Sequence, residues 1–238
     1  MTTKPPSVDL IEFASPESLA ERLSADIASR LDAAIAERGK AVLAVSGGTT
    51  PKQFLRSLSA RPIAWDKVTV TLVDERLVPA SSERSNARLV TLNLLQAHAA
   101  RARFASFVTA GELADAADRS EAALAGLQLP FDCVVLGMGT DGHTASFFPD
   151  AAGLGAALDR KTDRRVAAIA AAEAGEPRLT LTLPVIVSAR CVALHIEGLE
   201  KKETLRAALA RGPVNAMPVR AVLAALPAPL KVYWAPGA

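Results

Sequence analysis

Short apolar runs alternate with amphipathic stretches along the chain, and this alternation restricts the fold more than any other feature. Residues 41–45 and 191–196 are almost entirely apolar, as expected of strands buried on both faces. Between such runs, apolar residues recur at helical spacing, as in Leu19, Leu23 and Ile27. This pattern predicts a single α/β domain over residues 1–238, with a mostly parallel sheet covered by helices on both faces.

Local signals mark where several of these elements begin and end. Ser15 followed by Pro16 and Glu17 is typical of a helix start, and Gly39 is a typical stop. Strict alternation of Leu and Thr predicts a half-buried strand over residues 178–183, ending at Pro184. Further strands are expected over residues 68–73, 131–136, 166–170 and 230–234, and further helices after Pro51, after Ser85–Asn86, over 113–127, through Leu205 and Leu209, and after Pro218.

The composition excludes several classes of protein. Of the 238 residues 50% are hydrophobic, the net charge is only +2, and Lys and Arg are scattered among Asp and Glu. Aromatic residues make up 4%, too few for a base-stacking surface, so we expect no nucleic-acid partner. No secretory signal is evident in residues 1–10, and no apolar run approaches the roughly 18 residues of a membrane span.

The two cysteines, Cys133 and Cys191, both fall in predicted buried strands, where a thiol behaves as a small hydrophobe. A disulfide is possible on count alone, but the lack of a secretory signal favours a reducing cytoplasm. We therefore expect a cytoplasmic protein that does not bind membranes. Its oligomeric state stays open between a monomer and a homodimer.

The loop at residues 137–149 is the first candidate for the chemistry. It follows a buried strand and begins with three glycines in six positions, which allow a tight turn and close approach to a ligand. The loop carries Asp141 and His143, and imidazole is the side chain that titrates near neutral pH unaided. His143 is therefore a candidate general base.

A second glycine-containing turn, Ser46-Gly47-Gly48-Thr49, joins the strand at 41–45 to a predicted helix. Backbone N–H groups at a helix start, together with serine and threonine hydroxyls, favour an anion such as phosphate. A tight turn without any ligand is the alternative.

Charged residues at two further places are candidates for ligand binding. Asp74-Glu75-Arg76 follows a strand, at the end where open α/β sheets bind ligands, although a solvated loop is the alternative. Lys201 lies in the first turn of a predicted helix, where the helix dipole favours an anionic ligand beside it. Glu200 and Glu203 are alternative partners for that lysine. Arg178, at the start of a strand, is open to the same two interpretations, a contact with a ligand or with a surface partner.

Other motifs lack the context that their chemistry needs. Residues 137–142 match G-x-G-x-x-G, but no long helix or suitably placed acid follows, so a dinucleotide site is rejected. The sequence contains no Walker motif and no G-x-S-x-G, and nothing selects Ser46, Asp74 and His143 as a triad. The three histidines lack metal-ligand spacing, and His195 is interpreted as a core residue.

Taken together, these motifs resemble the 6-phosphogluconolactonase family. They follow the family's order over most of the chain, and the run G-M-G-x-D-G-H-T-A-S-x-F-P at residues 137–149 is highly specific. The related glucosamine-6-phosphate deaminases carry a glutamate five residues after the histidine, where this chain has Phe148. The lactonase branch is therefore favoured. The other motifs that carry the resemblance are 46–51, 74–79 with 85–86, 178–182 and 198–201.

The resemblance implies a Rossmann-like fold, like that of the deaminases, and hydrolysis of 6-phospho-D-glucono-1,5-lactone in the oxidative pentose phosphate pathway. It implies no metal and no organic cofactor. Aldose–ketose isomerisation and a non-catalytic sugar-phosphate-binding regulator are the alternatives. His143 is the expected general base, with Asp141 orienting it or the water, or only stabilising the turn. The expected substrate-binding residues are Ser46, Gly47, Gly48, Thr49, Asp74, Arg76, Arg178 and Lys201.

Overall fold

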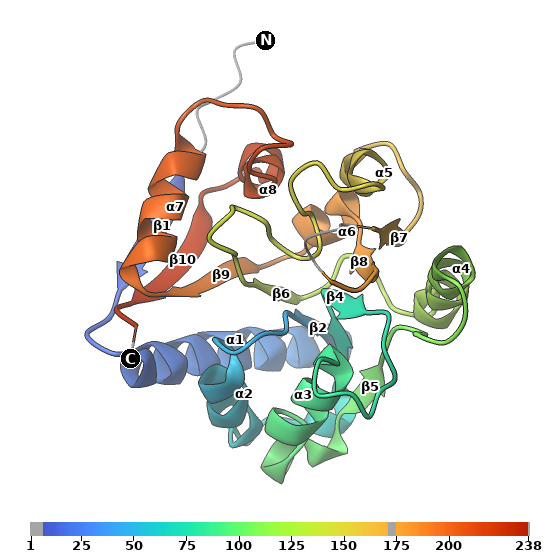
Figure 1. The fold of residues 1–238 in the computed structure, drawn as a ribbon. Coiled ribbons are helices and arrows are strands. Elements are labelled where there is room, and N and C mark those ends of the chain that lie inside the picture. The colour runs from blue at the N-terminus through green and yellow to red at the C-terminus, as the bar shows by residue number, and fades with distance from the viewer. Residues whose placement is uncertain (1–6, 171–174, 238) are drawn as a thin grey trace.

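The computed structural model describes residues 7–170 and 175–237, and a parallel sheet runs through its centre (Figure 1). Within these residues the sheet has seven strands in the order β1-β10-β9-β6-β2-β3-β5, and all neighbours run parallel. The prediction of a mostly parallel sheet is confirmed. The strands are β1 (Val8–Glu12), β2 (Ala41–Val45), β3 (Val68–Leu72), β5 (Arg103–Ala105), β6 (Cys133–Leu136), β9 (Val192–Glu197) and β10 (Leu230–Ala235).

Helices pack on both faces of this sheet, as the alternating sequence predicts. Figure 1 shows α1 (Pro16–Arg38) and α2 (Lys52–Ser59) on one side, with α7 (Leu199–Leu209) and α8 (Val219–Ala225) on the other. The predicted start of α1 is confirmed, because the Ser15 hydroxyl accepts a hydrogen bond from the Ser18 amide at 3.3 Å. The remaining α-helices are α3 (Asn86–Asn93), α4 (Leu113–Leu124), α5 (Leu154–Leu158) and α6 (Leu183–Ser188).

A second, antiparallel sheet was not predicted. It consists of β4 (Asp74–Arg76), β8 (Arg178–Leu181) and β7 (Val166–Ile169), with β8 in the middle. The prediction that the strand over 178–183 is half-buried is wrong, because every residue of β8 is buried. That strand also ends at Leu181, and α6 follows with a proline in its first turn.

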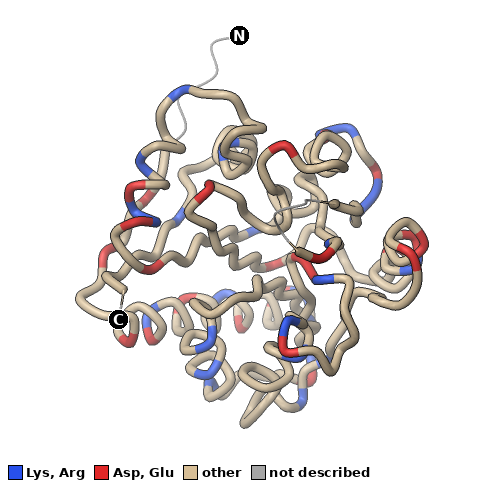
Figure 2. Tube along the Cα trace, in the orientation of Figure 1, with Lys and Arg blue, Asp and Glu red and all other residues tan. Residues whose placement is uncertain are grey.

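Two further observations bear on the class of protein. Acidic and basic residues are interspersed along the helices (Figure 2), and no helix in the described part of the chain is long and apolar enough to cross a membrane. Cys133 and Cys191 are both buried, as expected from the sequence, and their thiols are free.

Candidate active site

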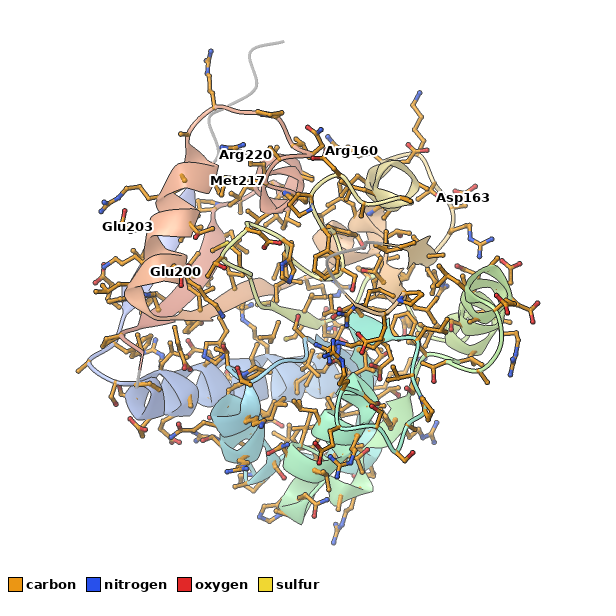
Figure 3. The ribbon with its side chains drawn as sticks, viewed as in Figure 1. Arg160, Asp163, Glu200, Glu203, Met217 and Arg220 are labelled. Carbon is orange, nitrogen blue, oxygen red and sulfur yellow. The ribbon has the colours of Figure 1, made fainter. Side chains whose placement is uncertain are left out.

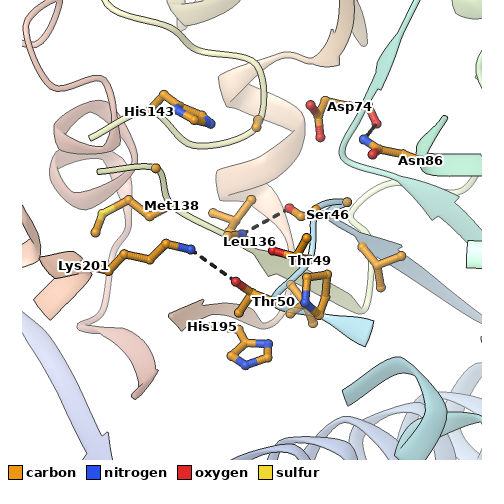
Figure 4. Close-up of a pocket in the computed structure, with 18 of the residues that line it drawn as sticks. Ser46, Thr49, Thr50, Asp74, Asn86, Leu136, Met138, His143, His195 and Lys201 are labelled. Atoms are coloured by element: carbon orange, nitrogen blue, oxygen red, sulfur yellow. Dashed lines mark hydrogen bonds between the residues drawn. The ribbon is translucent and has the colours of Figure 1, made fainter. Parts of the chain in front are cut away.

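The carboxyl ends of four neighbouring strands, β9, β6, β2 and β3, meet at one edge of the main sheet. The chain runs from β2 through β3 to β5 and then returns to place β6 on the other side of β2. Strand order therefore reverses between β2 and β6, and open α/β sheets bind ligands at such a switch point. A cavity of about 380 Å³ lies there (Figure 4).

This cavity brings together residues from all four strand ends. Asp141 does not line it directly but contacts a residue that does. The other predicted site residues all line the cavity: Ser46, Gly47, Gly48, Thr49, Asp74, Arg76, His143, Arg178 and Lys201.

The turn after β2 is joined to the turn after β6. The Ser46 hydroxyl accepts a hydrogen bond from the Gly137 amide at 3.2 Å, and the Ser46 amide donates to the Val135 carbonyl at 3.0 Å. Helix α2 begins at Lys52, directly after the turn, and no side chain caps its N-terminus. The Lys52 amide donates to the Thr49 carbonyl at 3.5 Å, and the positive end of the α2 dipole still points at the turn, which favours an anionic ligand there.

The segment Asp74–Arg76 is a buried strand rather than the solvated loop that the sequence left open. Glu75 accepts hydrogen bonds from the Asn86 and Ala87 amides, both at 2.7 Å, and so holds the start of α3. Burial raises the pKa of Glu75, although these hydrogen bonds oppose the shift. Its neighbour Asp74 lines the cavity and accepts a hydrogen bond from the Ser146 hydroxyl at 2.7 Å.

His143 and Asp141 form the pair that the sequence predicts. The imidazole Nδ1 lies 2.6 Å from Asp141 Oδ1, and the His143 amide donates to the same oxygen at 3.0 Å. Partial burial acts to raise the pKa of Asp141, but the hydrogen bonds and charge of His143 outweigh it, so this pKa is lowered. In the described part of the chain the His143 Nε2 has no hydrogen-bond partner, and the ring lines the cavity. An imidazole whose Nδ1 contacts a carboxylate and whose ring lines the cavity is suited to act as a general base.

Three cationic side chains line the same cavity. Arg76 and Arg178 are opposite each other on the antiparallel strands β4 and β8, and Arg178 is only 5% exposed. Burial, and then the charge of Arg76, lower the pKa of Arg178, while Asp74 and Glu176 oppose the shift. Such a concentration of buried positive charge favours an anionic ligand.

Lys201 approaches the cavity from α7, and its Nζ donates to the Thr50 hydroxyl at 3.2 Å (Figure 4). Burial lowers the pKa of Lys201, although the charges of Glu197 and Glu200 act against the shift. The alternative partners Glu200 and Glu203 are exposed on α7 (Figure 3), and Glu203 pairs with Arg206 at 3.1 Å. Lys201 therefore faces the cavity rather than a surface pair.

Among the cavity-lining residues that sequence reasoning did not select as site residues are Asn86, Phe148 and His195. Asn86 donates to the Asp74 carbonyl at 2.9 Å, and Phe148 packs against His143. His195 is buried, as predicted, but its Nε2 lies 3.0 Å from Glu197 while its Nδ1 has no partner in the described residues. His195 and Glu197 are two residues apart and therefore lie on the same face of β9. This spacing was the signal in the sequence that could have indicated their contact.

In the described residues no group of three His, Cys, Asp or Glu side chains is arranged to hold a metal ion.

Comparisons with known proteins agree on one family. The model of the family described as glucosamine-6-phosphate isomerases/6-phosphogluconolactonase matches residues 14–234. The chain is 58% identical to the 6-phosphogluconolactonase of Mesorhizobium japonicum over 225 residues, covering 94% of each chain. It is 54% identical to that of Rhizobium meliloti, covering 97% of this chain and 100% of the relative. A crystal structure of a 6-phosphogluconolactonase from Shewanella baltica superposes with a TM-score of 0.93 at 40% identity, covering 97% of this chain and 99% of that one.

Proposed function

The chain belongs to the family of glucosamine-6-phosphate isomerases and 6-phosphogluconolactonases, and on that premise we propose that it is a hydrolase that converts 6-phospho-D-glucono-1,5-lactone to 6-phospho-D-gluconate. This reaction is the second step of the oxidative pentose phosphate pathway. One observation carries the proposal: His143, which is paired with Asp141, lines the same cavity as three cationic side chains. A base and an anion site in one cavity are what hydrolysis of a phosphorylated lactone needs.

His143 is the proposed general base. Its Nε2 takes a proton from a water molecule while the water oxygen bonds to the lactone carbonyl carbon. The bond from that carbon to the ring oxygen then breaks, and His143 returns the proton to the ring oxygen. Asp141 supports this role because its contact with Nδ1 fixes the ring's tautomer and stabilises the imidazolium that forms. General-base help of this kind is worth about 10²–10⁴-fold.

The phosphate group is proposed to bind in the turn after β2. Ser46, Gly47, Gly48 and Thr49 offer backbone amides and hydroxyls there, and the ammonium of Lys201 lies beside Thr50. Arg76 adds positive charge, and Asp74 offers an acceptor for a sugar hydroxyl. A phosphate anchored at one end of the cavity would hold the carbonyl against the water on His143.

Arg178 has two candidate roles, a contact to the phosphate or to the oxyanion that develops on the carbonyl. Its guanidinium carbon lies 5.7 Å from the centroid of the Phe148 ring, which itself contacts His143. This closeness to the base supports the oxyanion role, whereas its pairing with Arg76 supports the phosphate role.

Phe148 supports lactone hydrolysis over the alternative isomerisation. It stands five residues after His143, where the deaminases carry a glutamate, and its apolar ring fills that place against the imidazole. Nothing else in this loop supplies a carboxylate beside His143 except Asp141.

The test is to generate the lactone in situ and follow its loss above the spontaneous rate, with glucosamine 6-phosphate assayed in parallel for ammonia release. We expect lactone loss without ammonia, and His143→Ala should lower kcat by at least about 10²-fold. Ammonia release would contradict the proposal in favour of deaminase chemistry. Binding of 6-phosphogluconate without any turnover would contradict it in favour of a regulator.

We also propose that residues 1–238 act as one domain in the cytoplasm. One cluster of buried apolar residues spans both sheets, which supports a single domain, and two free thiols support a reducing compartment. The oligomeric state, a monomer or a homodimer, is measurable by light scattering.

A further inference from the structure

Phe148 contacts two of the proposed functional groups with one ring. Its centroid lies 4.4 Å from that of His143, with the two planes tilted by 36°, and the Arg178 guanidinium lies over the same ring at 5.7 Å. The ring also lines the cavity. Because one side chain contacts both the proposed base and a cation that lines the cavity, Phe148 can couple their positions.

The hydrogen bond to Asp141 does not by itself fix the imidazole. It holds Nδ1, but the ring plane can still turn about that contact, and the His143 side chain is 30% exposed on a loop. An aromatic face packed on the imidazole restricts this rotation and so sets the direction of Nε2. A base must lie within hydrogen-bond reach of the proton that it removes, and small misplacements are costly.

The ring also suits the charge that develops. When His143 accepts a proton, an imidazolium forms against the same ring over which the Arg178 guanidinium lies. The face of an aromatic ring carries negative potential and attracts both cations. An aliphatic side chain of similar size offers no such face.

The loop backbone is built to hold Phe148 in place. Ala145 and Asp150 lie on either side of it with φ of 52° and 51°, a left-handed conformation that non-glycine residues rarely adopt. Such strain persists only where the surroundings enforce it. Here the Ser146 hydroxyl bonds to Asp74, and Phe147 is completely buried.

We propose that Phe148 is a positioning residue that acts through His143: its ring fixes the plane of the imidazole and keeps the Arg178 guanidinium beside it. This inference rests on the proposed lactone hydrolysis. It predicts that loss of the ring lowers turnover more than substrate binding, and that the loss depends on His143 being present.

The test compares Phe148→Leu and Phe148→Tyr with the matched control Phe147→Leu, a buried neighbour that does not line the cavity. Phe148→Leu should lower kcat by on the order of tenfold, with KM changed by less than about threefold, because the base is misplaced rather than lost. Phe148→Tyr keeps the aromatic face and should retain kcat within about threefold. Phe147→Leu should lower the melting temperature but keep kcat within about twofold.

Two further measurements separate positioning from general damage. In a His143→Asn background, Phe148→Leu should change kcat by less than about twofold, because the group through which it acts is already gone. In proton NMR, the ring-current shift of the His143 C–H resonances should disappear in Phe148→Leu and persist in Phe147→Leu.

An unchanged kcat in Phe148→Leu, or the same tenfold loss in the His143→Asn background, would overturn the inference. Either result leaves the proposed function standing, since wild-type lactone turnover is the reference for both. If the wild-type chain does not hydrolyse the lactone, the proposed function fails instead. The NMR shift then still reports whether Phe148 holds the imidazole.

Discussion

Gly47 lies in the turn proposed to bind phosphate and packs against Asn86 at the start of α3, and Gly47→Ala tests that contact. A Cβ added at Gly47 would overlap the side-chain amide of Asn86. That amide is 2% exposed and donates to the Asp74 carbonyl at 2.9 Å. The methyl group therefore has to displace either the turn or the amide.

Both responses cost stability. Forcing an extra methyl group into a packed site costs typically about 1–3 kcal/mol. Moving the Asn86 amide away from Asp74 leaves a buried polar group unsatisfied, at a further cost of about 1–3 kcal/mol. We expect Gly47→Ala to lower the free energy of unfolding by about 2–6 kcal/mol, and the displaced turn should raise KM for the lactone.

Urea unfolding and lactone kinetics of four variants, Gly47→Ala, Asn86→Ala, their double variant and Gly137→Ala, check this prediction. Gly137→Ala is the matched control, because its added Cβ would meet nothing within 4 Å and the residue lines the same cavity. Its stability should stay within about 1 kcal/mol of the wild type. In Gly47→Ala combined with Asn86→Ala the clash is gone, so the double variant should be destabilised by less than the sum of the singles. Strict additivity, or a Gly47→Ala protein as stable as the wild type, would refute the reasoning.

Four other outcomes follow from the site. Asp141→Asn should lower kcat by on the order of 10²-fold in the lactone assay, because the amide no longer holds Nδ1 as the carboxylate does. Since the pKa of Asp141 is lowered, the stability that its carboxylate adds should be present above pH 3.8 and be lost as the pH falls through the lowered pKa, which urea unfolding against pH will measure. Burial lowers the pKa of Lys201 from 10.5, so binding of 6-phosphogluconate should weaken as the pH rises through this lowered pKa, before 10.5 is reached, and calorimetry should show no such loss in Lys201→Met. Arg178→Met should lower kcat/KM by about 10²-fold, in kcat if Arg178 stabilises the oxyanion and in KM if it binds phosphate. An unchanged kcat/KM would contradict both roles.

The elements predicted best are those whose signals are local. The Ser15 cap and the apolar run of β2 depend only on their own residues, and both match the structure. The small antiparallel sheet was not predicted, because the alternation of Leu and Thr in β8 is typical of a strand with one face exposed to solvent. Thr180 and Thr182 are buried because their hydroxyls bond to backbone carbonyls, as Thr182 does to Arg164 at 2.7 Å. No periodicity in the sequence reveals such a partner.

The residues of the site were likewise predictable where the signal was local and not where it depended on distant contacts. Residues in motifs at strand ends, such as Ser46 and His143, were predictable because carboxyl ends of parallel strands meet at one edge. Asn86 and Phe148 were not selected, because their contacts depend on how α3 and the long loop fold back over the cavity. His195 shows the limit of pattern reasoning, since a residue in a buried strand can also line the site.

Hydrogen bonds join the turn proposed to hold the phosphate to the loop that carries His143. They link phosphate binding to the position of the lactone carbonyl. The turn proposed to hold the phosphate is tied to the His143 loop through Ser46 and Gly137, and that loop is tied to β4 through Ser146 and Asp74. The first bond is 3.2 Å long and partly buried and the second is 2.7 Å long and buried, so the turn, the base loop and β4 cannot shift independently without breaking a hydrogen bond. Energy from binding the distant phosphate can therefore orient the carbonyl against the water on His143. A lactone lacking the phosphate should thus lose kcat as well as affinity, and if it lost affinity alone, the two halves would not be mechanically coupled.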